Sequence, residues 1–142
     1  MTEQELFWGK YTIDNIEEAK KDEYYEIRSE AFGVLGYTEE ALKDEDYEIR
    51  RDAFRFLGYT EEAKKDEDHN IRRDAFLVLG FTPEAKKDPH WVIRLEAYRF
   101  FGYTEEALKD EDIDIRKEAE LYFKIQKARG LKQWIMSLIW KI

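Results

Sequence analysis

The 142-residue sequence contains no cysteine, only two histidines and only two prolines. The lack of cysteine excludes disulfides and thiolate chemistry, and it leaves only histidines and carboxylates as ligands for zinc. No run of roughly 18–20 apolar residues is present, so the sequence offers no candidate for a transmembrane helix. The N-terminal residues show no basic segment followed by an apolar run. We therefore expect no signal peptide and a cytoplasmic location.

Basic residues are also fewer than acidic residues. The chain has 33 acidic residues against 24 lysines and arginines, which gives a formal net charge of -9. Such an excess favours solubility and disfavours a general attraction to nucleic acid or to anionic membrane. The hydrophobic fraction of 43% is nevertheless enough for a core, and the length predicts one domain.

The strongest pattern in the sequence is a repeat of 22 residues, which runs five times between residues 15 and 124. Residues 37–58 and 59–80 are identical at 17 of 22 positions. The columns that recur throughout are an isoleucine (Ile27, Ile49, Ile71, Ile93, Ile115) and an alanine (Ala31, Ala53, Ala75, Ala97, Ala119). A glycine recurs at the end of the first four units (Gly36, Gly58, Gly80, Gly102).

Each unit predicts a short helix followed by a longer one, as residues 37–58 illustrate. Thr38 is placed to cap the short helix, and Asp44 is placed to end it and to cap the next. The longer helix is predicted over residues 45–57, and Gly58 suits the left-handed position that follows a helix. One apolar stripe is predicted along the longer helix, at helical spacing: Ile49, Ala53, Phe56 and Leu57.

Helices this short are marginal in water when isolated, so stacking between units must hold them. The sequence therefore predicts an all-α protein, an α-solenoid of five 22-residue two-helix repeats. We expect an N-terminal cap over residues 1–14, the five repeats over 15–124 and a C-terminal capping helix over 125–142. Leu6, Phe7 and Trp8 are the candidates for covering the first repeat.

The repeat resembles a known family. The segments "DEDYEIRRDAFRFLG" and "KDPHWVIRLEAYRFFG" resemble the second half of short HEAT repeats of the bilin-lyase type, with the pattern D-P-x-x-x-V-R-x-x-A-x-x-x-L-G. The segments "TPEAKKDP" and "TEEALKDED" are similar to the leucine-rich-repeat variant. The resemblance covers residues 15–124 and implies a fold, because these families share no active site. The 22-residue unit is shorter than a HEAT repeat, so the first helix is truncated.

The resemblance also implies a structural role for one arginine column. HEAT-like stacks use an aspartate and an arginine six residues later as a ladder between neighbouring units. A guanidinium beside an apolar stripe also needs a carboxylate or carbonyl partner. The expected ladder residues are Asp22, Arg28, Asp44, Arg50, Asp66, Arg72, Asp88, Arg94, Asp110 and Arg116.

The arginine that follows the ladder arginine varies between units and lies about 160° from the isoleucine stripe, so an outward orientation is expected. Columns four residues before and after share that face. Three interpretations remain open for it: a solvated mixed surface, a protein- or peptide-binding face, or a face that binds the phosphate backbone of a nucleic acid. The candidate binding residues are Tyr47, Arg51, Arg55, His69, Arg73, Leu77, Trp91, Leu95 and Arg99.

The segment after Lys124 is basic, with Lys127, Arg129, Lys132 and Lys141 and no acidic residue. Beside the capping helix, two alternatives stay open: a helix for self-association or a partner, and an interfacial membrane helix. The candidate association residues are Trp134, Ile135, Leu138 and Ile139, in a broad apolar face with Leu131 and Ile142.

Nothing in the sequence predicts catalysis. The acidic residues recur with the repeat, whereas a catalytic pair is expected to occur once. No catalytic residue, metal site or cofactor is expected. We interpret the chain as a non-enzymatic protein- or peptide-binding scaffold. The alternatives are a nucleic-acid-backbone binder and a membrane-peripheral adaptor that uses the C-terminal helix, and self-association through that helix is a further option.

Overall fold

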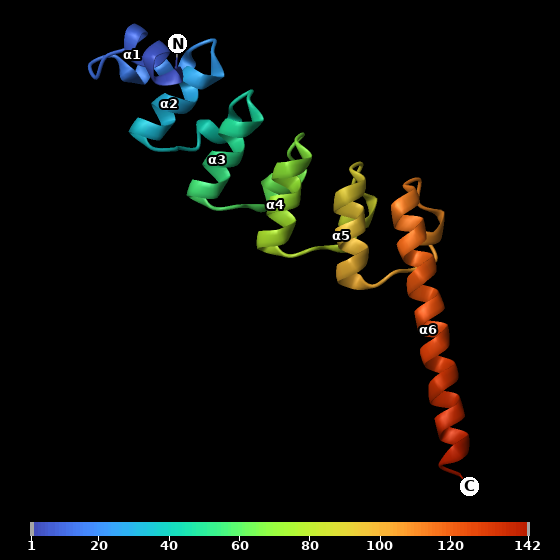
Figure 1. Ribbon diagram of the computed structural model, residues 1–142. Helices are drawn as coiled ribbons and strands as arrows, with labels where there is room; N and C mark the ends of the chain where they lie inside the picture. Colours follow the sequence, from blue (N-terminus) through green and yellow to red (C-terminus); the bar gives the residue numbers. More distant parts are fainter. Residues whose placement is uncertain (1, 142) are drawn as a thin grey trace. The chain divides into compact units, whose positions relative to one another are not determined.

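The computed structural model describes residues 2–141, except for the side chains of residues 3, 4 and 6, and these residues form helices and no strands (Figure 1). The prediction of an all-α protein is confirmed. The α-helices are α1 (Glu3–Lys10), α2 (Tyr25–Leu35), α3 (Tyr47–Leu57), α4 (His69–Leu79), α5 (Trp91–Phe101) and α6 (Ile113–Ile139). The 3₁₀ helices are η1 (Ile16–Lys21), η2 (Ala41–Lys43), η3 (Glu61–Lys65), η4 (Pro83–Lys87) and η5 (Ala107–Lys109).

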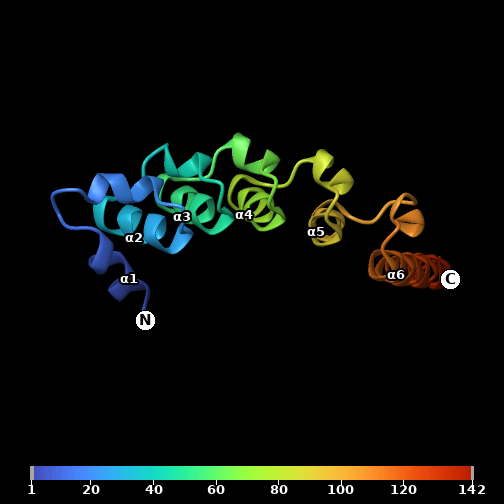
Figure 2. The same ribbon diagram turned by 90° about the horizontal axis from the view of Figure 1, so that it is seen from above.

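The chain divides into two compact units, one that ends at Gly80 and one that begins at Phe81. In the first unit, η2 and η3 lie on the same side of α3 and α4 (Figure 2). In the second unit, η4 and η5 lie in the same way beside α5 and α6. Every 22-residue period thus contains one 3₁₀ helix and one α-helix, an arrangement compatible with a helical repeat.

The caps of the helices differ from the sequence-based expectation. Asp46, and not Asp44, caps α3, because its carboxylate accepts the backbone N–H groups of Glu48 and Ile49 at 2.9 and 3.3 Å. Asp44 accepts the backbone N–H of Asp46 at 2.8 Å and so shapes the turn before the helix. Thr38 does not cap η2 with its side chain, since that helix begins only at Ala41.

The glycine that follows each 11-residue helix is confirmed in its predicted role. Gly58 has φ 103°, a backbone conformation in which a side chain is strained. Its N–H donates to the carbonyl of Phe54 at 2.8 Å and so closes the last turn of α3. The chain can then turn directly into the next 3₁₀ helix.

The predicted apolar stripe is wrong in its second half. Ile49 and Ala53 are fully buried, but Phe56 is 67% exposed and Leu57 is also exposed. Phe54 is buried in their place and stacks on Tyr59. The cause is the short partner helix: three to five residues of 3₁₀ helix extend about 6–10 Å, whereas an 11-residue α-helix extends about 16 Å. The last turn of the longer helix is therefore left uncovered.

The same packing recurs in the described core. The isoleucine and alanine columns are buried beside the alanine of each 3₁₀ helix. In the first four repeats, one large aromatic residue per repeat fills the remaining space: Phe32, Phe54, Phe76 and Tyr98. The Nζ atoms of Lys64 and Lys86 lie over the rings of Phe76 and Tyr98, 5.3 and 5.6 Å from the ring centroids, so these lysines make cation–π contacts with the aromatic layer.

The N-terminal segment covers the first repeat as expected. Phe7 in α1 is fully buried in a cluster with Ile16, Ala19 and Ile27. Trp8 is half exposed and meets the Phe7 ring edge to face at 4.8 Å. The side chain of Leu6 lies outside the described residues.

The C-terminal segment is not the separate capping helix that was predicted. Residues 125–139 continue α6 without a break, and every residue from Lys124 to Lys141 is exposed (Figure 1). The reason lies at position 124, where a lysine occupies the place of the glycine that ends the four preceding helices. Without that glycine the helix has no left-handed residue at which to stop, and it extends past the end of α5.

Candidate functional site

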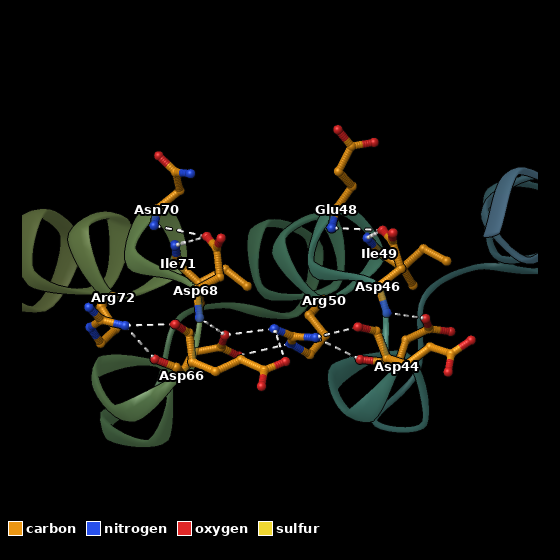
Figure 3. A network of polar contacts seen from close by, with 12 residues as sticks. Asp44, Asp46, Glu48, Ile49, Arg50, Asp66, Asp68, Asn70, Ile71 and Arg72 are labelled. Atoms are coloured by element: carbon orange, nitrogen blue, oxygen red, sulfur yellow. Dashed lines mark hydrogen bonds and ion pairs between the residues drawn. The ribbon is translucent and has the colours of Figure 1, made fainter. Parts of the chain in front are cut away.

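The ladder arginine Arg50 lies in a buried network, which Figure 3 shows. Its Nε and Nη2 atoms donate to both carboxylate oxygens of Asp66 at 3.0 and 2.9 Å. Its Nη1 atom donates to the backbone carbonyls of Asp44 and Glu45 at 2.9 and 3.0 Å. The guanidinium thus joins its own repeat, through two carbonyls, to the carboxylate of the next repeat. Hydrogen bonding to Asp66 raises the pKa of Arg50, so the arginine stays charged.

The same geometry occurs at two other junctions. Arg28 bonds both oxygens of Asp44 at 2.9 Å, and Arg94 bonds both oxygens of Asp110 at 2.9 and 3.0 Å. In each case the carboxylate lies sixteen residues after the arginine, and the aspartate six residues before it contributes only its backbone carbonyl. Burial acts to raise the pKa of Asp110, but the hydrogen bonds from Arg94 and from a backbone N–H outweigh it and hold the pKa below its usual range.

The two ends of this ladder are completed differently. Asp22 is buried, and its carboxylate accepts Lys10 Nζ and Tyr11 Oη, both at 2.5 Å. Residues from the N-terminal segment thus stand where an arginine of a preceding repeat would be. Arg116 donates to the carbonyls of Asp110 and Glu111, and the residue sixteen positions after it is Lys132 rather than an aspartate.

Arg72, in the middle of the ladder, also donates to two backbone carbonyls, and Asp88 is buried.

Arg51, which follows the ladder arginine Arg50, was predicted to face outward, and the structure corrects that prediction. Its Nε atom donates to Asp74 at 2.8 Å, and only 28% of its side chain is exposed. Tyr59 Oη donates to the same carboxylate at 3.0 Å. Burial acts to raise the pKa of Asp74, but the bonds from Arg51 and Tyr59 outweigh it and lower the pKa. Arg51 therefore forms a second contact between neighbouring repeats.

A matching group lies in the second unit. Both Arg99 and Tyr103 bond Glu118, the latter through Oη at 2.5 Å. Hydrogen bonding to Arg99 lowers the pKa of Glu118. Burial, followed by the bond to Glu118, raises the pKa of Tyr103 to about 12. Sequence reasoning missed these tyrosines and acidic residues, although Tyr103 and Glu118 lie 44 residues, or two repeats, after Tyr59 and Asp74.

The remaining predicted binding residues separate into exposed and covered positions. Those exposed in the structure are Tyr47, Arg55, Leu77, Trp91 and Arg99. His69 and Arg73 are partly buried. Leu95 was expected on the outer face but is 7% exposed, since it packs in a cluster with Tyr98 and Ile115. An apolar side chain at that helix position turns into the junction between repeats.

The uncovered last turns form a surface that the sequence analysis did not predict. We name it the end strip: Val34, Leu35, Phe56, Leu57, Val78 and Leu79, all in the first unit. Phe100 and Phe101 stand at the equivalent positions of α5 in the second unit. All eight side chains are exposed. Within the first unit, the same arginine–aspartate contact relates α2 to α3 and α3 to α4, so these three helices present their C-terminal turns on the same side. The sequence feature that could have predicted the end strip is the short first segment of each repeat, which cannot cover the full length of the longer helix beside it.

No enclosed chemical site emerges from the part of the chain that the structure describes. A shallow polar hollow on the outer face is lined by Tyr47, Glu48, Arg51, Asp52, Arg55 and Asn70. Among residues 2–141, no group of three histidine or acidic residues is arranged to hold a metal ion. Within that range, no helix has both the length and the apolar character that a membrane crossing requires.

Searches of family models, of curated proteins and of solved structures found no match to this chain.

Proposed function

We propose that the chain is an α-solenoid of five short, HEAT-like repeats that serves as a non-enzymatic scaffold and binds a segment of another protein. The observation that carries the proposal is the end strip. Phe56 and Val78 occupy equivalent positions in two neighbouring repeats of the first unit and are 67% and 64% exposed. Burial of one such side chain stabilises a complex by roughly 1.5–3 kcal/mol, so a ligand that covers several of them gains a useful affinity.

The regular placement of the strip favours an elongated ligand. Each of the three longer helices of the first unit contributes two adjacent apolar residues, and the helices place these pairs in series. A peptide with apolar side chains at intervals fits such a row better than a compact small molecule, for which a concave pocket is needed. Exposed Arg55 and Leu77, from the originally predicted outer face, lie next to Phe56 and Val78 in sequence and extend the surface.

The charges of the outer face argue against the nucleic-acid alternative. Arg51 and Arg55 both lie within 3.7 Å of Asp74, and Arg99 is paired with Glu118. Phosphate binding would have to break these pairs and would then leave the carboxylates beside the phosphates. A protein ligand requires no such exchange.

The proposal is tested by selecting binders to the full chain from a displayed library of random peptides and measuring their affinities by calorimetry. Replacing Phe56 and Val78 with serine is expected to weaken the selected peptides at least about tenfold, because each change removes roughly a kcal/mol or more of apolar burial. Ile13→Ser is the matched control, since Ile13 is 69% exposed but lies outside the strip. A selection that returns no binder would contradict the proposal. So would binders whose affinity is the same for the Phe56 and Val78 replacements as for the Ile13→Ser control.

A further inference from the structure

The distal part of α6 is an uncovered helix with many large apolar side chains. Between residues 131 and 140, seven large apolar side chains are exposed: Leu131, Trp134, Ile135, Met136, Leu138, Ile139 and Trp140. A helix of about 17 residues with Gly130 in its interior is marginal in water without tertiary support. An apolar surface of this size on a helix that needs support indicates that another phase or molecule covers it.

The charge of this segment differs from that of the rest of the protein. From residue 121 onward the chain contains five cations and no acidic residue: Lys124, Lys127, Arg129, Lys132 and Lys141. Because the whole chain has a net charge of -9, residues 1–120 have a net charge of -14. The segment is thus suited to an anionic surface. Pairing it with the same segment of a second copy would bring five cations beside five cations.

The width of the apolar surface distinguishes between a groove and a lipid interface. At about 100° per residue, the apolar side chains of residues 131–140 spread over roughly 240° of the helix circumference. A helix that docks into one protein groove needs an apolar stripe of only about 100°. A helix embedded at the boundary between headgroups and acyl chains is covered over a much larger part of its circumference. Trp134 and Trp140 are also the side chain type that gathers at this boundary.

We propose that residues 124–141 bind an anionic lipid surface, with the apolar side chains in the acyl boundary and the lysines and Arg129 at the lipid phosphates. This inference is independent of the end strip. All 33 acidic residues lie before residue 121, so the segment that contacts the lipid phosphates contains only cations. Exposed charges more than about 8 Å from the lipid surface are largely screened at physiological salt.

The experiment is a flotation assay with the full chain and two kinds of vesicle, one of phosphatidylcholine alone and one with about a third phosphatidylserine. We expect flotation with the anionic vesicles, weakened by high salt and by the absence of phosphatidylserine. Replacing Lys127, Arg129 and Lys132 with glutamine should reduce partitioning about 100-fold, at roughly a factor of five per cation. Replacing Trp134 and Trp140 with serine should also abolish flotation, whereas the control Phe56→Ser, on the end strip, should float as the unaltered chain does.

The possible results separate the lipid surface from other occupants. All of these side chains are exposed, so the variants should keep the helical circular dichroism of the unaltered chain. No flotation of the unaltered chain with anionic vesicles at low salt would overturn the proposal. So would flotation that survives both sets of tail changes. Sedimentation that reveals a dimer abolished by Trp134→Ser, without vesicle binding, would assign the apolar surface to a second copy instead.

Discussion

Removal of the Arg50 guanidinium offers the sharpest test of how the repeats are joined. The side chains of Arg50 and Asp66 are only 7% and 10% exposed, and the pair is bidentate at 2.9 and 3.0 Å. Arg50→Ala leaves the Asp66 carboxylate buried without its charge partner and frees two backbone carbonyls. The expected loss in the free energy of unfolding is about 3–5 kcal/mol. With a slope of about 2 kcal/mol per M, the urea midpoint should fall by roughly 2 M.

Arg116→Ala is the matched control for that measurement. Arg116 bonds the same two carbonyl positions, but Lys132 stands where the next aspartate would be. We therefore expect a loss of only about 1–2 kcal/mol, the value of the carbonyl bonds. Both variants are unfolded in urea and followed by circular dichroism at 222 nm. Equal losses, within about 0.5 kcal/mol, would refute the idea that the carboxylate of the next repeat contributes most of the stabilisation.

Three further predictions follow from the fold. Gly58→Ala should lower the free energy of unfolding by about 1–2 kcal/mol because φ is 103°, whereas Gly33→Ala, within α2 and with open space around it, should raise it by about 0.5–1 kcal/mol in the same melts. Phe54→Ala should cost about 3–4 kcal/mol and Phe56→Ala less than about 1 kcal/mol by urea unfolding; equal costs would contradict the placement of the core. Because the pKa of Tyr103 is raised to about 12, its phenol stabilises the fold below the unfolded pKa of about 10, and this contribution is lost as pH rises from 10 through 12. Tyr103→Phe should flatten the decline of stability with pH in that window, and an unchanged decline would show that the tyrosine does not contribute.

Periodicity predicted the helical class and the recurring core, but it could not identify the partners in the ladder. In a 22-residue repeat, an aspartate six residues before an arginine and an aspartate sixteen residues after it belong to the same column. The sequence therefore treats the two pairings as equivalent. Only the structure distinguishes them, since Arg50 bonds the carbonyl of Asp44 but the carboxylate of Asp66.

The errors in predicting which side chains of the longer helices are buried have a similar origin. Phe54, Phe56 and Leu57 are all apolar, and the helical pattern alone does not reveal how far a partner helix covers them. That depends on the length of the 3₁₀ helix, which forms only in contact with its neighbour. Leu95 was predicted to face outward because its column lies about 160° from the isoleucine stripe, whereas this apolar side chain turns inward. The continuous α6 was predictable from Lys124, the one position at which the glycine column is interrupted.

The ladder also makes the protein modular in its length. The junctions at Arg28 and Arg50 use the same atoms and the same spacing, so either arginine could pair with the aspartate of any repeat that follows it. Deleting residues 37–58 would place Asp66 sixteen residues after Arg28, and duplicating them would supply one more matched pair. A gene that encodes such a chain can therefore gain or lose whole 22-residue units without leaving an unpaired buried charge. A deletion of any other length would shift the carboxylates out of register with the arginines.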